Sequence, residues 1–260
     1  MGTRTRILAL AVGLAVQGSL AACALTVSVA EFRLVAAPNG SVEASLVVLN
    51  DEPRGVVLSL QVTDWDDAPD GVTHLLPIGD VGRSCSRWLD IDTTIFSLAA
   101  FEERVVTVVV RVPDGARGTY WSGLLVSAAP TGVSSDSGGG ISSEALVRLF
   151  VTIPPTDARA SVTALSVLSF APLRVHAQLT NLGDVRLSDV TGVLTLERSS
   201  GPAISFPLPQ INVLPGHSAD VDTVLTWQPD ADDAGLFLVR AVFDYGGESL
   251  VAGQIVLRAP

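Results

Sequence analysis

The residues of this chain that could carry out chemistry are few and far apart. The histidines His74, His176 and His217 and the cysteines Cys23 and Cys85 show none of the short spacings of a zinc motif. The G-x-S-x-G turn that presents a nucleophilic serine does not occur. All 16 basic residues are arginine, so the lysine of a phosphate-binding loop is missing. We therefore expect a protein that is not an enzyme and that has no cofactor.

Calcium is the one metal for which the sequence offers a candidate site. Asp64, Asp66, Asp67 and Asp70 lie within one short segment, and Ca²⁺ binds several carboxylate oxygens from a single loop. Their spacing departs from that of a helix-loop-helix calcium loop, and Asp70-Gly71 is also a typical hairpin turn. We expect a solvated hairpin turn here, with calcium binding by the four carboxylates as the alternative.

The chain is acidic, with 27 aspartate and glutamate residues against 16 arginines and a formal net charge of −11. Removal of an N-terminal signal would take away Arg4 and Arg6 and leave a still more acidic protein. A nucleic-acid partner requires a basic surface that neutralises phosphates, and no stretch of this sequence provides one. We therefore expect no nucleic-acid partner and no binding to an anionic membrane surface.

The N-terminus is typical of an export signal. Two arginines precede the apolar run Ile7–Val16, and small residues follow it. Two processing routes remain open, because Ala22-Cys23-Ala24 matches a signal-peptidase site while Leu20-Ala21-Ala22-Cys23 resembles the bacterial lipobox, in which the cysteine is lipidated. We assign residues 1–24 to a cleaved signal peptide, with Cys23 as the lipidation candidate. Either route leaves Cys85 without a disulfide partner, and we expect it to be a small buried hydrophobic residue.

Short strands are the elements that must position the remaining residues. Apolar or alternating runs rich in valine, leucine and threonine recur and end at turns such as Pro38-Asn39-Gly40. The 23 glycines and 15 prolines are spread along the chain and argue against long helices. Seven or eight strands in about 100 to 130 residues are typical of an immunoglobulin-like sandwich. We predict an all-β protein with two tandem immunoglobulin-like β-sandwich domains, residues 25–154 and 155–260, after the cleaved signal peptide.

The two halves resemble distant copies of each other. Leu49-Asn50 in the first half corresponds to Leu179-Thr180-Asn181 in the second. Leu98-Ala99-Ala100 corresponds to Leu214-Pro215-Gly216, in each case just before a long strand. We expect the two domains to share these corners.

Part of the first half resembles a known family. The stretches that carry the resemblance are Ser28–Val35, Gly40–Asp51, Arg117–Val126, and Leu149-Phe150 running into Pro154-Pro155. They resemble the PapD-like periplasmic chaperones of pilus assembly over roughly residues 27–155. The resemblance implies two immunoglobulin-like domains set at an angle, with a last strand of domain 1 that is donated to an incomplete pilin subunit. The second half is more similar to the immunoglobulin-like domains of exported bacterial surface proteins.

This resemblance implies a set of partner-binding residues. The donated strand corresponds to Ala145–Ile153, where Val147, Leu149 and Val151 lie in one alternating row. Such a row is equally typical of a strand that faces its own core. In the chaperones an arginine and a lysine anchor the terminal carboxylate of the subunit. Arg33 matches the arginine, but Leu146 stands at the lysine position and Arg148 is two residues away.

These observations lead to two functional interpretations. In the first, the chain is an exported binding or assembly protein, similar to pilus chaperones, which holds another envelope or surface protein through an exposed strand of domain 1. In the alternative, it is a structural or adhesive cell-surface module without a chaperone role. Both place it in the periplasm or at the cell surface, and lipidation of Cys23 would make it an outer-membrane lipoprotein, with the lipid as its only membrane contact.

Overall fold

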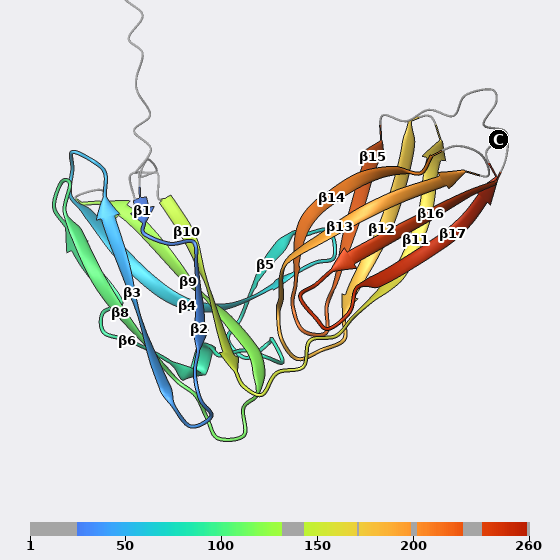
Figure 1. The fold of residues 1–260 in the computed structure, drawn as a ribbon. Helices are drawn as coiled ribbons and strands as arrows, with labels where there is room; N and C mark the ends of the chain where they lie inside the picture. The colour runs from blue at the N-terminus through green and yellow to red at the C-terminus, as the bar shows by residue number, and fades with distance from the viewer. Residues whose placement is uncertain (1–24, 132–142, 171, 199–201, 226–235, 259–260) are drawn as a thin grey trace, which may run out of the picture.

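The computed structural model describes residues 25–131, 143–170, 172–198, 202–225 and 236–258 of the chain. The predicted export signal and the lipidation candidate Cys23 lie outside these residues. The described residues form two β-sandwiches that meet at an angle (Figure 1). They include the short 3₁₀ helix η1 (Ser86–Trp88), and none of their helices is both long enough and apolar enough to cross a lipid bilayer.

Strands β1 to β10 build the sandwich of domain 1. One sheet has the order β1 (Leu25–Val27), β3 (Ser41–Asn50), β8 (Glu103–Arg111) and β6 (Leu89–Ile91). The other has the order β2 (Glu31–Val35), β10 (Ser143–Ile153), β9 (Gly118–Pro130), β4 (Val56–Asp67) and β5 (Thr73–Leu76), and β7 (Ile95–Leu98) pairs with β4. The start of the chain thus crosses from the first sheet at β1 to the second at β2, where it pairs in parallel with β10.

Strands β11 to β17 build the sandwich of domain 2. A three-stranded sheet has the order β11 (Ala160–Phe170), β12 (Leu173–Asn181) and β15 (Ser218–Leu225). A four-stranded sheet has the order β14 (Ile204–Val213), β13 (Leu187–Arg198), β16 (Leu236–Asp244) and β17 (Val251–Arg258). The prediction of an all-β fold with two immunoglobulin-like sandwiches is confirmed.

The alternation of the sequence places one row of each strand in a core. β-Branched residues dominate strands such as β8, where they fit a pleated, half-buried surface. Val106, Val108 and Val110 of β8 are fully buried with Leu46 and Val48 of β3. A separate buried cluster fills domain 2. Each sandwich therefore has its own hydrophobic core.

A third buried cluster joins the two domains. Trp65, Val81, Trp121 and Phe150 come from domain 1, and Leu214 comes from domain 2. The indole N–H of Trp121 donates to the Trp65 carbonyl at 2.8 Å, which satisfies a polar group that burial would otherwise penalise. Because aromatic side chains bury large areas, this cluster makes a substantial contribution to the domain interface.

Backbone contacts reinforce the domain interface. Thr119 donates its N–H to the Asp184 carbonyl at 2.7 Å, and Asp220 donates to the Pro69 carbonyl at 2.8 Å. Gly118 has φ +77°, and a Cβ there would lie 2.2 Å from the Asp184 oxygen. Only glycine allows the two backbones to approach so closely at this point.

Both domains build the same corner. Asn50 ends β3 and Asn181 ends β12, and both side chains are buried. The backbone N–H of Asn50 donates to the Ala99–Glu102 turn at 3.0 Å, and that of Asn181 donates to the Leu214–His217 turn at 2.9 Å. Both side-chain amides also donate to backbone carbonyls around these turns. The likeness between the two halves is therefore confirmed at this corner, but the hydrogen bonds align Ala99, and not Leu98 as expected, with Leu214.

Candidate functional site

The first half of β10 is an open sheet edge. β10 pairs with β9 along its whole length, from Ser143 to Ile153, whereas β2 covers only Arg148 to Thr152. Within the described residues, Ser143–Val147 therefore has a strand on one side only. We call this segment the β10 edge.

The direction of the backbone groups in the β10 edge follows from the pairing. Arg148 donates its backbone N–H to the Ala30 carbonyl at 2.9 Å, on the side of β2. Alternate residues of a strand direct their N–H and C=O groups to the same side. The backbone groups of Glu144 and Leu146 consequently point away from β9, toward the open side. These are the groups to which another strand could add.

The side chains of Val147, Leu149 and Val151 face the core of domain 1. All three are fully buried in the domain 1 cluster. The expectation that this row contacts a partner is therefore wrong for the folded domain. The physical reason is that these side chains lie on the face of the sheet that packs against the other sheet of domain 1.

Leu146 and Phe150 of the opposite row of β10 face the interface between the domains. Phe150 packs in the interdomain cluster, edge-on to Trp65 with ring centroids 5.6 Å apart. Leu146 packs against the same cluster, and a Cβ on Gly123 would lie only 2.6 Å from its Cδ1 atom. The opposite row is mixed, since Glu144, Arg148 and Thr152 alternate with Leu146 and Phe150, and its two apolar side chains serve the interdomain cluster.

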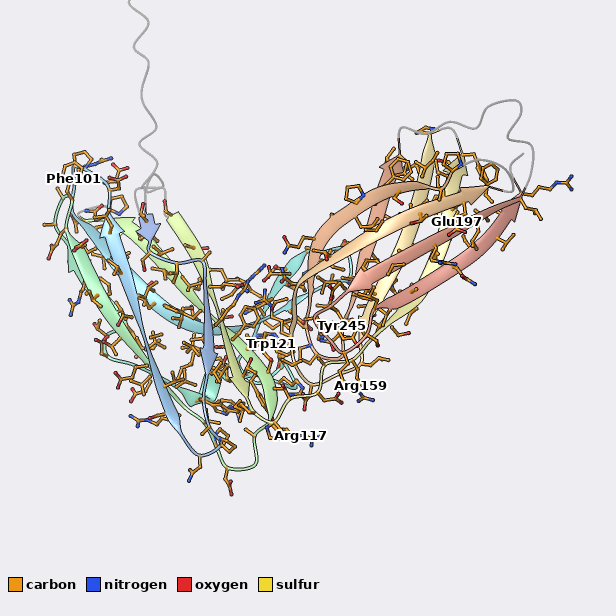
Figure 2. All side chains as sticks on the ribbon, in the orientation of Figure 1. Phe101, Arg117, Trp121, Arg159, Glu197 and Tyr245 are labelled. Carbon is orange, nitrogen blue, oxygen red and sulfur yellow. The ribbon has the colours of Figure 1, made fainter. Side chains whose placement is uncertain are left out.

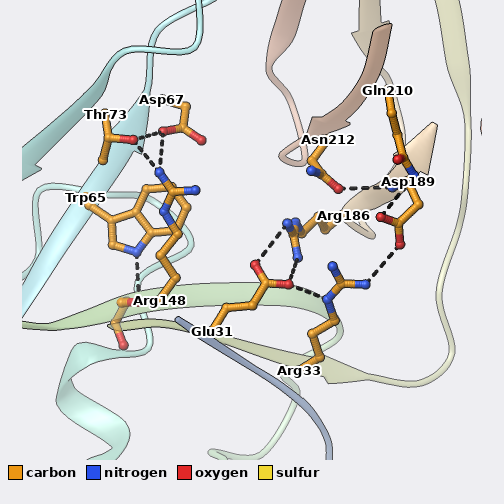
Figure 3. Close-up of polar contacts among 11 residues, drawn as sticks. Glu31, Arg33, Trp65, Asp67, Thr73, Arg148, Arg186, Asp189, Gln210 and Asn212 are labelled. Atoms are coloured by element: carbon orange, nitrogen blue, oxygen red, sulfur yellow. Dashed lines mark hydrogen bonds and ion pairs between the residues drawn. The ribbon is translucent and has the colours of Figure 1, made fainter. Parts of the chain in front are cut away.

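Arg148 directly follows the β10 edge and contacts Thr73, Asp67 and Trp65 (Figure 3). Its guanidinium donates to the Thr73 hydroxyl at 2.5 Å and lies 3.7 Å from the Asp67 carboxylate. The same guanidinium lies over the Trp65 ring, 4.7 Å from its centroid. About a third of the side chain remains exposed, so part of its charge faces solvent.

Arg33 takes part in an ion-pair network between the domains rather than standing free. It pairs with the carboxylates of Glu31 in its own strand and of Asp189 in domain 2, the latter at 3.0 Å. The hydrogen bond to Glu31 raises the pKa of the Arg33 guanidinium. The arginine suggested by the resemblance therefore already has two protein partners.

Arg186 is the residue of this network that the sequence did not reveal. Its two terminal nitrogens lie 3.3 Å from the two carboxylate oxygens of Glu31, and its guanidinium covers the Phe150 ring at 3.9 Å. Burial lowers the pKa of Arg186, against the effect of Glu31. Partial burial alone would raise the pKa of Glu31, but hydrogen bonds from Arg33 and Arg186 lower it. No sequence spacing could indicate this contact, since the partners are 155 positions apart.

The aspartates of the calcium candidate serve different purposes. Asp64 is fully buried, and its carboxylate accepts hydrogen bonds from the Gly79 N–H at 2.7 Å, the Ser84 hydroxyl at 2.6 Å and the Ser86 hydroxyl. Charge-assisted hydrogen bonds of this kind compensate the burial of a carboxylate. Asp64 therefore fastens the segment that leads into η1.

The other three carboxylates point to separate partners. Asp66 lies 2.8 Å from the imidazole Nε2 of His217 in domain 2. Asp67 accepts a hydrogen bond from Thr73 at 2.5 Å, and Asp70 caps the hairpin turn through the Val72 N–H at 3.1 Å. Among the described residues, no group of three or more His, Cys, Asp or Glu side chains could hold a metal ion. The four aspartates thus contribute to the hairpin, to the segment that leads into η1 and to the domain interface, and they do not form a shared calcium site.

Cys85 is a buried, unpaired thiol, as expected. Its Sγ atom lies 3.4 Å from the Ser122 hydroxyl. Burial raises the pKa of Cys85 to about 12, so the reactive thiolate is scarce at neutral pH.

Comparisons with known proteins identify the fold. No protein-family model and no curated protein sequence matches the chain. A chain of the chaperone–tip adhesin complex of CFA/I fimbriae biogenesis is similar, with 11% identity, a TM-score of 0.51, and coverage of 91% of this chain and 100% of that chain. The class 5 fimbriae chaperone CfaA is similar as well, with 12% identity, a TM-score of 0.50, and coverage of 91% and 100%. The chain has the PapD-like fold of two immunoglobulin-like domains set at an angle.

Proposed function

We propose that this chain is an exported, non-enzymatic binding protein that holds another envelope or surface protein through the β10 edge. The observation that carries the proposal is the open side of Ser143–Val147, where two residues direct backbone groups away from β9 that no strand among the described residues pairs with. Main-chain hydrogen bonds from an added strand supply affinity without requiring a particular side-chain row. The burial of the Val147 side chain therefore does not remove the proposed site, because the site depends on backbone groups.

Three other edge strands, β1, β6 and β14, are less suited to strand addition. β1 and β6 contain only three residues each, and short edge strands offer few pairing groups. β14 carries Pro207 and Pro209, and proline lacks the N–H donor that a neighbouring strand needs. The β10 edge has neither protection.

Arg148 supplies the charged part of the proposed site. It lies directly after the β10 edge and is partly exposed, and its ion-pair distance to Asp67 is 3.7 Å. Arg33 is held more closely by two carboxylates. We therefore assign a partner carboxylate to Arg148, with Arg33 beside it as part of the domain interface. Leu146, at the lysine position of the resemblance, offers an apolar contact instead of a second charge.

Two substitutions at Glu144 test the proposal. Glu144 is exposed, and its carboxylate accepts a hydrogen bond from Ser127 at 3.2 Å. Glu144→Pro and Glu144→Ala both remove this contact, but only proline also removes the outward N–H and obstructs an added strand. We expect Glu144→Pro to reduce capture of an envelope protein in pull-downs from exporting cells about tenfold, and Glu144→Ala to retain it. Equal capture by both variants would contradict strand addition at this edge.

The burial of the apolar row of β10 favours the alternative function. A structural or adhesive surface module needs no exposed donor row, and Val147, Leu149 and Val151 form none among the described residues. If neither Glu144 variant changes partner capture while deletion of the whole chain reduces surface adhesion, the adhesive module is the better assignment.

A further inference from the structure

The four-stranded sheet of domain 2 ends in a long edge strand. β17 pairs with β16 along all eight of its residues, from Val251 to Arg258. No strand of the described residues pairs with its other side, and it lies along the outer border of the domain (Figure 1). An edge of this length presents a row of backbone N–H and C=O groups to which another strand can add.

β17 lacks the features with which proteins block such edges. Proline and bulges interrupt the backbone groups that an added strand needs. β14 carries two prolines, and the pairings of β11 and β14 contain register shifts. β17 has no proline, and its pairing with β16 has no register shift. The strand is therefore well suited to pairing with another chain.

The core-facing row of β17 is incompletely covered. In the neighbouring β16, Val239 and Phe243 of the core-facing row are only 1% exposed. Val251, Ile255 and Leu257 of β17 pack against the same core but are only half-buried. A strand added beside β17 would remove more of this apolar surface from water, which is favourable.

The exposed row of β17 is complementary to itself. Paired residues of antiparallel strands lie on the same face, and faces alternate along each strand. Two copies of β17 can therefore pair in antiparallel only about a two-fold axis that passes through a residue. With this axis at Gly253, Leu250 of each copy lies opposite Val256 of the other, and Glu248 lies opposite Arg258. The apolar pair joins two side chains that are 61% and 63% exposed in one chain.

The loop between β16 and β17 places Glu248 at this end of the strand. The loop begins at Tyr245 (Figure 2). A Cβ on Gly247 would lie 2.3 Å from the Tyr245 ring, so the loop backbone packs directly on this ring. Glu248 follows Gly247 and is exposed, as is Arg258 at the other end of β17. The two ends of the strand thus carry opposite charges.

Neighbouring registers lose both matches. With the axis at Ala252, Glu248 would lie opposite Val256. With the axis at Gln254, Leu250 would lie opposite Arg258. Opposite charges and apolar side chains directly across from each other stabilise antiparallel pairs. The sequence of this edge therefore favours the register centred on Gly253.

We propose that the chain forms a two-fold symmetric dimer in which the β17 edges of two copies pair about Gly253. The pairing joins the two four-stranded sheets into one continuous sheet. Leu250 and Val256 supply the apolar contacts, and the exposed Glu248–Arg258 pairs at both ends select the register. All pairing residues belong to domain 2, so this dimer does not depend on partner capture by the β10 edge.

Charge reversal tests the ion pairs of the dimer. Arg258→Glu places two glutamates opposite each other at both ends of the paired strands, and Glu248→Arg places two arginines there. We expect each single variant to raise the dimer dissociation constant of the exported protein about tenfold in sedimentation velocity at low salt. The double variant Glu248→Arg/Arg258→Glu should return it to within about twofold of the wild-type value.

Matched aspartates locate the contact on the sheet. Val256→Asp places a charge opposite Leu250 of the other copy. Val193→Asp places the same charge on β13, inside the same sheet and away from this edge. Both valines are exposed, by 63% and 43%, so both variants should fold. We expect Val256→Asp to weaken the dimer at least about tenfold and Val193→Asp to leave it unchanged.

Disulfide crosslinking tests the register. Leu250→Cys and Val256→Cys combined in one chain lie six positions apart, or about 20 Å along the strand, so they can be joined only between copies. We expect mild oxidation to give a covalent dimer of this double variant and monomers of each single variant on a non-reducing gel. Cys85 is buried and does not interfere.

Four results would overturn the proposal. The first is a monomer at every protein concentration, which is also the result expected if β17 receives a different protein. The second is a double charge reversal that fails to restore the dimer. The third is equal weakening by Val256→Asp and Val193→Asp, which would indicate that the sheets pack face to face. The fourth is a double-cysteine variant that gives no covalent dimer.

Discussion

Replacing Arg186 by alanine should uncouple the two domains. Arg186 comes from domain 2, but its guanidinium lies between Glu31 and Phe150 of domain 1, and its side chain is only 8% exposed. The substitution removes two contacts with the Glu31 carboxylate and the cover over the Phe150 ring. After the substitution, Arg33 is the remaining arginine of this network that pairs with Glu31.

The expected cost follows from this geometry. Charge-assisted hydrogen bonds are worth roughly 1.5 to 3 kcal/mol, but the Arg186–Glu31 distances of 3.3 Å are longer than usual for such bonds, so the lower end applies. The cation–π contact with Phe150 adds about 1 kcal/mol. We expect Arg186→Ala to lower the free energy of unfolding by about 2.5 kcal/mol, of which about 1.5 kcal/mol is coupling to Glu31 in a double-mutant cycle.

Urea unfolding of wild type, Arg186→Ala, Glu31→Gln and the double variant measures this coupling. The surface pair Arg240–Glu197, 3.9 Å apart with both side chains 41% exposed, is the control, for which we expect about 0.3 kcal/mol. A coupling energy for Arg186 and Glu31 no larger than that of the control pair would refute the reasoning.

The same cycle has a defined pH dependence. The pKa of Glu31 in the folded protein is lowered from its ordinary value near 4.5. A lowered carboxyl pKa stabilises the folded state fully above the unfolded value, and the stabilisation is lost as pH falls through the folded value. The coupling should therefore be equal at pH 7 and pH 5.5 and should decline only below about pH 4.5. A loss of coupling between pH 7 and pH 5.5 would contradict the assigned cause.

Two further substitutions test the assignments of buried and strained residues. Val147→Asp should abolish cooperative folding of domain 1, because an unpaired buried charge costs several kcal/mol. Val147→Ala should still fold, with a loss of about 2 kcal/mol in the free energy of unfolding. Urea unfolding followed by circular dichroism distinguishes the two variants, and a stable Val147→Asp would mean that the row does not face the core. Phe101→Gly should raise the free energy of unfolding by about 0.5 to 1 kcal/mol, because relief of the left-handed backbone at this residue, where φ is +59°, exceeds the entropy cost of glycine; a lower melting temperature would show that the Phe101 ring contributes to packing.

Local patterns in the sequence were sufficient for the strands and for several turns. β8 could be predicted because it is a short run rich in valine and threonine that ends at the Pro113-Asp114-Gly115 turn, which is typical of a strand. The hairpin at Asp70-Gly71 could be predicted because glycine tolerates the positive φ of +84° that the turn requires. Both features depend only on residues that are close in sequence.

The orientation of β10 could not be predicted in the same way. Alternation separates a strand into two faces, but it does not say which face meets the core. In β10 the apolar row of Val147 fills domain 1, whereas Leu146 and Phe150 of the mixed opposite row border domain 2. The apolar row of a donated strand and the apolar row of an ordinary core strand therefore look alike in the sequence.

The ion-pair network between the domains could not be predicted from the sequence for another reason. Glu31 and Arg33 are two residues apart and visible as a local pair, but Arg186 reaches them only after both domains have folded and docked. Its position depends on the close approach of Gly118 to Asp184, which sets the two backbones in contact. Tertiary geometry, and not local propensity, selects this arginine.

The shared corner explains how one fold can hold two different surfaces. Asn50 and Asn181 satisfy the backbone of their turns from within each sandwich, so the turn residues are free to vary without loss of the corner. Domain 2 uses this freedom to place Leu214 and His217 on domain 1, and domain 1 uses it to expose Phe101. Loops on a rigid scaffold are where binding surfaces change most readily. A variant that exchanges the two turns should therefore keep both sandwiches folded while it loses the domain interface.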